Sequence, residues 1–295
     1  MKKALPLIAV LLIFLVGVGV LVYPLVSSVA NNVAARQGAQ EYEVSVEQMD
    51  ETEINKMLDE AHKYNEGLHR VILTDPFDES TYALIGGNYT EILNVNGTGL
   101  IGYVDIPKIN VYLPIFHGTS LEVLSVGAGH LEHTAFPIGG ESTHSVISAH
   151  TAYPTQTFFD YLTEMEVGDE FFIHVLNQTL KYEVDEINVV LPEDTKKLYI
   201  EDGEDHVTLL TCTPYSVNTH RLLVRGTRVP YTPESGEKTS SLNFGDGAIY
   251  FLGYKVSYLT AALVMGGFVL FVTVVTVMIV RLNRRKKHKE DKNAS

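Results

Sequence analysis

Cysteine is almost absent from the 295-residue sequence, which holds only Cys212. A single cysteine excludes an internal disulfide, and it leaves no cysteine pair for a zinc site. Cys212 lies at the end of the apolar run of residues 208–211 and just before Pro214, with Arg221 shortly after it. A lone cysteine is more often a buried structural residue than a nucleophile. Its surroundings therefore decide its role, because an unpaired thiol outside the cell is a liability unless it is used.

Basic residues are scarce in the middle of the chain. The sequence has 22 Lys and Arg against 36 Asp and Glu; two of the basic residues precede residue 4 and seven follow residue 280, with two acidic residues in that tail. Residues 4–280 thus hold 13 basic and 34 acidic residues, a net charge of about −21. This charge argues against nucleic acid as a partner, since no basic patch is present to displace counterions. It attracts cationic partners such as an exposed lysine.

Two long apolar segments flank this acidic middle. Residues 5–22 are almost wholly apolar after Lys2 and Lys3, and residues 248–280 contain a second apolar run followed by a basic tail. About 20 apolar residues span a bilayer core, and basic flanks stay cytoplasmic. We therefore expect both termini inside the cell and the middle outside. For the first segment a cleaved signal peptide is the alternative, because residues 27–30 are small enough for cleavage.

Between these segments the sequence pattern changes from helical to β. From residue 40 to 68, apolar residues recur at three- and four-residue spacing, which predicts an amphipathic helix packed on the main domain. Residues 99–229 hold at least seven short runs rich in β-branched and aromatic residues, separated by Gly, Pro, Asp or Asn. Without regular helices between them, these runs predict an antiparallel barrel or sandwich. Residues 231–247 have the composition of a linker.

Histidines are frequent in the β region. His130 and His133 invite a metal site, but no His-Glu-x-x-His motif and no obvious third ligand accompany them, so we expect no metal. His150 ends a strand-like run and precedes a loop, as Cys212 does. A cysteine nucleophile needs an imidazole to share its proton or to protonate the leaving amine, and Arg221 can stabilise an anionic intermediate. These three residues are the candidate catalytic groups.

A short non-helical segment, Thr74-Asp75-Pro76-Phe77, precedes the β region. Pro76 biases Asp75 toward an extended conformation and breaks any helix. By its spacing alone, the segment predicts a surface turn.

The stretch TLLTCTPYSVNTHRLLVRG, residues 208–226, resembles the signature of the sortases, in which a TLxTC motif carries the nucleophile and a downstream arginine completes the site. The resemblance is closest to the class C, pilin-polymerising sortases of Gram-positive bacteria. It extends over nearly the whole chain through the segments AHKYNEGL, DPF, GYVDIPKINVYLPIFHGT, GHLEHTAFPIGG and THSVISAH.

The resemblance implies a mainly β fold: a closed, sortase-type, eight-stranded β-barrel with an N-terminal helical and lid extension and two flanking transmembrane helices. It implies that Cys212 is the nucleophile, His150 the catalytic histidine and Arg221 the arginine that stabilises substrate and oxyanion. The DPF motif would form a lid in which Asp75 meets the arginine and Phe77 covers the thiol. This replaces the surface turn as our expectation, and no cofactor is implied.

The expected organisation has six parts. They are an N-terminal transmembrane segment or signal anchor (1–30), an extracellular helical region and lid (31–95, with DPF at 75–77), a catalytic β-barrel (96–232), a linker (233–250), a transmembrane helix (251–281) and a basic cytoplasmic tail (282–295).

The implied reaction is cleavage of an LPxTG-like sorting signal between Thr and Gly, followed by attack of a pilin lysine to form an isopeptide bond. Two alternatives remain: a cell-wall-anchoring sortase that uses a peptidoglycan-precursor amine, and a catalytically idle pilus-associated scaffold. The sequence departs from the class C pattern at Ala149, Thr151 and Ala152, where GHRG is usual around the histidine, and at His133, where a small residue is usual. These departures bear on pilin specificity more than on catalysis.

Overall fold

The computed structural model describes residues 37–68, 75, 77, 88–95, 97–153, 156–232, 248–251 and 254–257, with single positions between 14 and 35 and between 260 and 281. Contacts divide the chain into two units, Met1–Ser240 and Ser241–Ser295. The two expected membrane segments lie largely outside the described residues. Among the residues that are described, no helix is both long and apolar enough to cross a bilayer. Both membrane spans therefore stay predictions.

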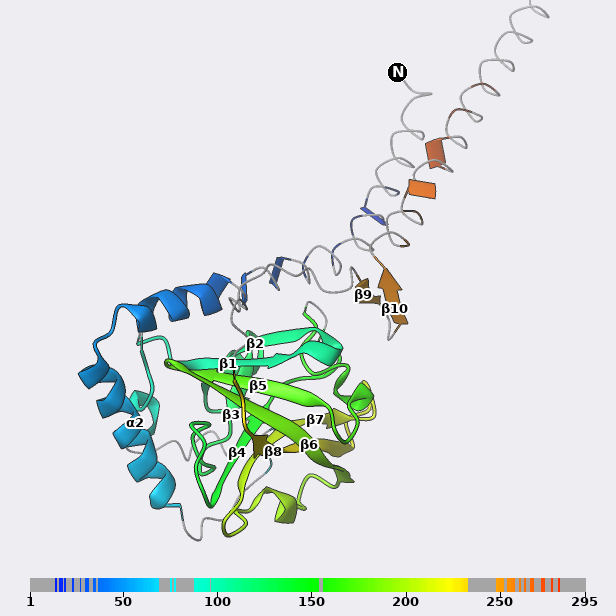
Figure 1. Ribbon diagram of the computed structural model, residues 1–295. Helices are drawn as coiled ribbons and strands as arrows, with labels where there is room; N and C mark the ends of the chain where they lie inside the picture. Colours follow the sequence, from blue (N-terminus) through cyan, green and yellow to red (C-terminus); the bar gives the residue numbers. More distant parts are fainter. Residues whose placement is uncertain are drawn as a thin grey trace, which may run out of the picture. The chain divides into compact units, whose positions relative to one another are not determined.

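Eight strands of the first unit close into a barrel in the order β1-β2-β3-β4-β7-β8-β6-β5 (Figure 1). The strands are β1 (Leu100–Ile106), β2 (Val111–His117), β3 (Ala128–His130), β4 (Thr143–Ser148), β5 (Glu170–Val175), β6 (Gln178–Val190), β7 (Asp205–Thr213) and β8 (His220–Val229). Two neighbouring pairs, β2–β3 and β4–β7, are parallel, and the other pairs are antiparallel. The closed eight-stranded barrel implied by the resemblance is confirmed, whereas the strand pattern alone predicted an antiparallel barrel or sandwich and did not reveal the two parallel pairs.

Short helices connect the strands. They are η2 (Tyr89–Glu91), η3 (Pro107–Ile109), α3 (Leu121–Leu124), η4 (Leu162–Glu164) and η5 (Lys196–Leu198). Of these, η4 ends the loop that follows β4, and η5 lies in the long connection between β6 and β7. Both connections reach the end of the barrel at which β4 and β7 finish.

The N-terminal helical region is broken in two, where the sequence predicted one helix from residue 40 to 68. Residues 37–47 are helical, and α2 (Glu51–Glu66) begins after a turn. The break occurs at Asp50, whose side chain accepts a hydrogen bond from the Glu53 amide (2.8 Å) and so caps the start of α2. The helical spacing of apolar residues continues through the turn, so the spacing alone predicts one helix. A helix N-cap is a single polar residue, and it does not interrupt that spacing.

Buried hydrogen bonds fix these helices to the barrel. The hydroxyl of buried Tyr42 donates to the Ile101 carbonyl (2.7 Å) and accepts from the Leu176 amide (2.8 Å). The side chain of Asn65 bonds both the carbonyl (3.1 Å) and the amide (2.7 Å) of Phe136. Polar side chains buried in this way are costly unless they are paired, so they fix one docking position.

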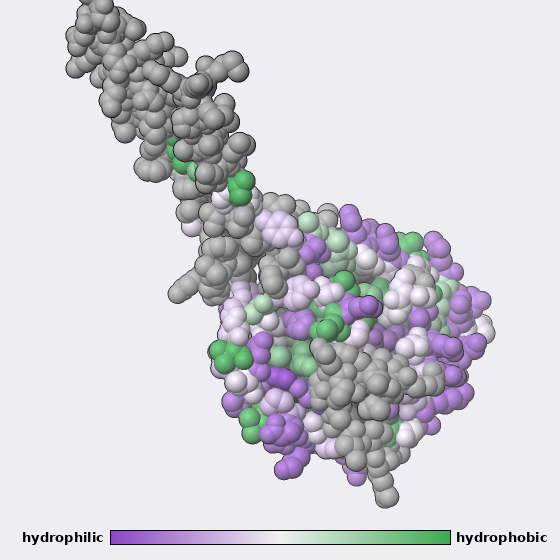
Figure 2. Space-filling model, turned by 180° about the vertical axis from the view of Figure 1, so that it is seen from behind, coloured by the Kyte–Doolittle hydropathy of each residue, from purple (hydrophilic) through white to green (hydrophobic). Residues whose placement is uncertain are grey.

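Strand β7 is buried along nearly its whole length, so both of its faces are covered. Side chains alternate between faces along a strand, which places Leu210 and Cys212 on the same face. On that face, Leu210 belongs to a buried cluster with Leu131, Val146, Leu198 and Leu223. This cluster provides the apolar surroundings on the side of the strand that carries the thiol. The face of the molecule seen in Figure 2 has hydrophobic residues in small groups among hydrophilic ones.

In the second unit, β9 (Ala248–Phe251) and β10 (Tyr254–Ser257) form an antiparallel hairpin. The hairpin crosses the boundary expected between the linker (233–250) and the second transmembrane helix (251–281).

Candidate active site

Three neighbouring strands bring His150, Cys212 and Arg221 into one row. Cys212 pairs directly with Arg221 in the antiparallel β7–β8 ladder. Strand β4 runs parallel to β7, and its last paired residue, Ser148, lies opposite Leu210. If the register of Ser148 with Leu210 is continued by two residues on each chain segment, His150 lies opposite Cys212. Residues opposite one another on adjacent strands point to the same face, so the three side chains share one face of the sheet.

Hydrogen bonds maintain this register beyond the end of β4. The Ala149 amide donates to the Leu210 carbonyl (3.1 Å), and the Thr211 hydroxyl donates to the Ala149 carbonyl (2.7 Å). The carbonyl of His150 itself accepts from the Phe159 amide (3.0 Å). Ala149, one of the departures from the class C pattern, is fully buried, and its position is fixed by backbone bonds.

The thiol of Cys212 is nearly closed off from solvent, at 8% exposure for the residue. Burial raises its pKa to about 11; the positive charge of Arg221 opposes this increase, and the negative charge of Asp75 adds to it. A thiol with such a pKa is almost wholly protonated at neutral pH, and the thiolate is the nucleophile. The structure therefore holds Cys212 in an unreactive form.

Arg221 is paired with Asp75. Its Nε and Nη2 atoms donate to the two carboxylate oxygens of Asp75 at 2.8 and 2.6 Å, and Nη1 donates to the carbonyls of Asn218 and His220, both at 3.1 Å. Both charged side chains are largely buried, with 10% and 13% of their areas exposed. The planar fork of the guanidinium is thus fully occupied by groups of this chain.

The side chain of Phe77 packs against two of the candidate catalytic residues. Its ring lies 5.6 Å from the ring of His150 and 5.1 Å from the guanidinium carbon of Arg221, centroid distances typical of aromatic and cation–π contacts. The ring also packs on the cluster that contains Leu210. These contacts, with those of Asp75, are inconsistent with a free surface turn.

The imidazole of His150 contacts two aromatic rings. Phe77 lies at 5.6 Å, and Tyr153 stacks at 5.4 Å with an interplanar angle of 11°. Burial lowers the pKa of His150 below its ordinary value. A neutral imidazole can accept the thiol proton, and it is then a strong enough acid to protonate a leaving amine.

One residue near the site escaped the sequence analysis. Asp160 accepts hydrogen bonds from the amides of Ala152 (2.9 Å) and Phe158 (3.0 Å), and the side chain of Tyr215 interacts with the same carboxylate. A single sequence does not reveal that an acidic residue ten positions after a histidine lies near it. The loop that places Asp160 there has no periodic pattern of residues.

His130 and His133 have structural surroundings. The ring nitrogens of fully buried His130 bond the Tyr89 hydroxyl (2.9 Å) and the Ala135 carbonyl (2.8 Å), and burial lowers its pKa to about 3. His133 adopts a left-handed conformation (φ 68°), and its amide donates to the Tyr64 hydroxyl (3.1 Å). Within the described part of the chain, no three His, Cys, Asp or Glu side chains are grouped to hold a metal.

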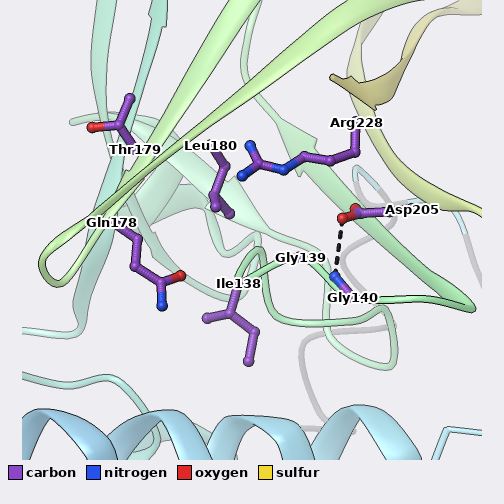
Figure 3. Close-up of a pocket in the computed structure, with 8 residues that line it drawn as sticks. All are labelled: Ile138, Gly139, Gly140, Gln178, Thr179, Leu180, Asp205 and Arg228. Carbon is purple, nitrogen blue, oxygen red and sulfur yellow. Dashed lines mark hydrogen bonds between the residues drawn. The ribbon is translucent and has the colours of Figure 1, made fainter. Parts of the chain in front are cut away.

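A separate cavity of about 430 Å³ lies at the opposite end of β7 (Figure 3). Its lining residues are Ile138, Gly139, Gly140, Gln178, Thr179, Leu180, Asp205 and Arg228. Asp205 accepts from the Gly140 amide (2.9 Å) and begins β7, whereas Cys212 lies near its other end, roughly 20 Å away at the rise of a strand. The cavity is therefore not part of the candidate active site.

Comparison with known proteins gives a consistent result. The sortase-domain family model matches residues 104–229. A crystal structure of Streptococcus pneumoniae sortase C is 44% identical, with a TM-score of 0.61, over 67% of this chain and 98% of that one. The pilus-related sortase C of Group B Streptococcus is 46% identical, with a TM-score of 0.61, over 65% of this chain and 97% of that one.

Curated relatives match over shorter stretches. Sortase D of Bacillus subtilis (strain 168) is 31% identical over 115 residues, which are 39% of this chain and 55% of the relative. The chain thus spans about half the length of the curated relatives that it matches. The fold, the matched domain and the extent of the sortase C matches agree: the chain belongs to the sortase family of cysteine transpeptidases, and within it resembles the class C sortases.

Proposed function

We propose that this protein is a membrane-anchored pilin polymerase. It cleaves an LPxTG-like sorting signal between Thr and Gly, and it joins pilin subunits through a lysine isopeptide bond. The observation that carries the proposal is the row of His150, Cys212 and Arg221 beneath the contacts of Asp75 and Phe77. Two similar structures support it: that of Streptococcus pneumoniae sortase C provides insight into pilin substrate specificity, and that of Group B Streptococcus is a pilus-related sortase C.

In the first step, the sulfur of Cys212 attacks the threonine carbonyl carbon of the sorting signal. The thiol proton passes to His150, and the guanidinium of Arg221 stabilises the oxyanion that forms. Collapse of this intermediate breaks the bond between Thr and Gly. His150 then gives its proton to the departing glycine amine, which leaves an acyl thioester on Cys212.

In the second step, the neutral ε-amine of a pilin lysine attacks the thioester carbonyl. His150 takes a proton from the attacking nitrogen and returns one to the departing sulfur. The products are an amide bond between the two pilins and the free thiol. The net charge of about −21 between the two apolar segments favours the approach of a lysine-bearing acceptor.

The closed lid must open for either step. While Asp75 holds Arg221, the guanidinium is not free to stabilise an oxyanion, and Phe77 lies against both His150 and Arg221. Lid departure removes the negative charge of Asp75 and admits water, and both changes lower the pKa of Cys212. Opening thus exposes the nucleophile and makes its proton easier to remove.

The two alternatives predict different acceptors. A cell-wall-anchoring sortase would pass the acyl group to a peptidoglycan-precursor amine, for which a lid of this kind has no obvious purpose. An idle scaffold would form no thioester at all. The second apolar segment also favours the pilin polymerase, because two membrane anchors would keep the site near membrane-held pilins.

An acceptor competition separates these cases. The full-length chain is incubated with an LPxTG-type peptide, and products are identified by mass spectrometry after addition of purified pilin or of an oligoglycine amine. We expect cleavage between Thr and Gly and transfer to a pilin lysine in preference to oligoglycine. Preferential transfer to oligoglycine would favour the anchoring enzyme, and absence of cleavage with the lid variants described below would favour the scaffold.

The membrane arrangement is tested separately. Protease added to intact cells should digest residues between the two apolar segments, whereas tags at both termini should stay protected until the cells are lysed. Digestion of either tag in intact cells would contradict the proposed orientation.

A further inference from the structure

The proposed reaction requires the imidazole of His150 and the thiol of Cys212 to keep a fixed spacing, yet each residue is followed by a loop. His150 begins the loop that runs to η4. Cys212 is followed within three residues by Tyr215, which is 49% exposed. Strand pairing fixes the residues before these loops, but it does not fix the loops themselves.

A single carboxylate bridges the two loops. Asp160 accepts from the amide of Ala152 at 2.9 Å through Oδ1 and from the amide of Phe158 at 3.0 Å through Oδ2. The side chain of Tyr215, in the loop after the thiol, lies close enough to this carboxylate to oppose the increase that burial causes in the pKa of Asp160. Hydrogen bonds to a charged acceptor are stronger than neutral ones, so this carboxylate is suited to hold both loops together.

The residues that Asp160 bonds adjoin the side chain that supports the imidazole. Tyr153 follows Ala152, stacks on the ring of His150 at 5.4 Å and meets the ring of fully buried Phe158 edge-on, also at 5.4 Å. Ala152 has a φ of 60°, a left-handed conformation that is uncommon for a residue with a side chain. A strained residue of this kind persists when its surroundings hold it in place, as the bond from Asp160 does.

We propose that Asp160 is a positioning residue, which holds the His150 imidazole beside the Cys212 thiol by joining the loop of Tyr153 to the loop of Tyr215. The inference rests on the proposed transpeptidase function. Asp160 acts through these neighbours, and its loss changes the placement of the imidazole without removing any group that binds substrate. A displacement of about 1 Å in a reacting group lowers a rate by roughly 100-fold.

The chain contains a matched control. Asp205 accepts one backbone amide bond, from Gly140 (2.9 Å), and one tyrosine hydroxyl bond, from Tyr182 (3.0 Å). It lies at the far end of β7 from the thiol. Asp205→Asn therefore perturbs a partly buried carboxylate of the same type at a place where the proposed mechanism predicts no effect on chemistry.

The test measures kcat and KM for cleavage of an LPxTG-type peptide by the full-length chain, together with hydrogen exchange at the amides of Ala152 and Phe158. For Asp160→Asn we expect kcat to fall about 10- to 100-fold while KM changes less than about 3-fold. Tyr215→Phe should lower kcat about 3- to 10-fold, because it removes the interaction of Asp160 with the second loop and keeps both amide bonds. Both variants should exchange the two amides faster, and Asp205→Asn should keep kcat within about 2-fold of wild type.

Several outcomes would overturn the proposal. One is an Asp160→Asn enzyme whose kcat is unchanged. Another is an equal decrease of kcat in Asp160→Asn and Asp205→Asn, which would indicate general destabilisation. If Asp160→Asn does not fold, Tyr215→Phe decides: unchanged kcat and unchanged exchange reject the bridge. If neither the wild-type chain nor the Asp75→Ala chain cleaves the peptide, the proposed function fails, and hydrogen exchange in the Tyr215→Phe variant still decides whether Asp160 couples the loops.

Discussion

The carboxylate of Asp75 binds the guanidinium of Arg221 through two hydrogen bonds of 2.6 and 2.8 Å. The same guanidinium is the group that we propose to stabilise the oxyanion at Cys212. One set of donors cannot serve both partners, so the resting pair and the reaction are mutually exclusive. In this structure the guanidinium is bound to Asp75, and in the proposed mechanism the strength of this pair sets how often the site opens.

Removal of either lid side chain should expose the thiol. Burial of an aromatic ring stabilises the closed state by about 1.5–3 kcal/mol, and a partly exposed ion pair adds about 1 kcal/mol or less. Since each 1.4 kcal/mol is a factor of ten, Phe77→Ala should raise the rate of Cys212 alkylation about ten-fold or more, and Asp75→Ala should raise it up to about five-fold. The rate is measured with iodoacetamide under native conditions.

The pair of Asp185 with Arg225 is the control for this experiment. Its Asp and Arg atoms approach to the same 2.6 Å, but the pair lies away from the thiol. Asp185→Ala should leave alkylation unchanged. Equal rates in wild type, Asp75→Ala and Phe77→Ala would mean that the segment is no lid.

The pH dependence of alkylation should show that the lid acts on the ionisation of Cys212. The pKa of Cys212 is about 11, so the wild-type rate should increase about ten-fold per pH unit from pH 7 to pH 10 without a plateau. The charge of Asp75 raises this pKa, and Asp75→Asn should therefore move the curve to lower pH. Phe77→Ala admits water to the site, and because burial is the larger cause of the raised pKa, its curve should move to lower pH as well. An Asp75→Asn curve that keeps the wild-type shape up to pH 11 would contradict the electrostatic contribution.

The β character of residues 99–229 and the strand-end positions of Cys212 and His150 could be predicted from the sequence because they are local features, whereas the closed barrel was implied by the resemblance to the sortases. Cys212 and His150 both end apolar runs, and a parallel pairing of β4 with β7 brings such ends together. The break at Asp50 did not follow, because the apolar spacing continues through it. The hydrogen bonds of Asp160 could not be predicted either, because they depend on how the loop after His150 folds back on itself. Contacts within a loop produce no periodic pattern in a single sequence.

Removal of the histidine or the arginine should abolish most turnover. Loss of a general acid typically costs 10²–10⁴-fold and loss of an oxyanion donor about 10²–10³-fold, which we expect for His150→Ala and Arg221→Ala in peptide cleavage. Arg221→Lys should not restore activity, because an ammonium lacks the planar fork. His130→Ala and His133→Ala are the comparison, with much milder effects on kcat per folded enzyme. A lysine variant as active as wild type would show that charge alone suffices.

The protein should lose stability in mild acid through its buried histidines. The ring nitrogens of His144 bond the Tyr199 carbonyl (2.9 Å) and the Thr208 hydroxyl (2.7 Å), and burial lowers its pKa to about 4. The unfolded chain binds this proton near pH 6.5, so stability is complete above that pH and falls as pH decreases toward 4. The slope is about 1.4 kcal/mol per pH unit for one such group.

Urea unfolding at pH 7.5 and pH 5 measures this effect. His144→Gln, which keeps a donor and an acceptor, should reduce the difference in unfolding free energy between the two pH values. The same substitution at exposed His62 is the control and should leave the difference unchanged. Identical pH dependence in wild type and His144→Gln would contradict the assignment.

The most direct test of the account is the mass of the enzyme during turnover. The full-length chain with Asp75→Ala, which holds the lid open, is mixed with an LPxTG-type peptide without an acceptor amine, quenched in acid and measured intact. The account predicts a mass increase equal to the peptide up to its threonine, located on Cys212, removable by hydroxylamine and absent when Cys212→Ala is added. An unmodified enzyme, or an adduct that persists in the Cys212→Ala protein, would contradict it.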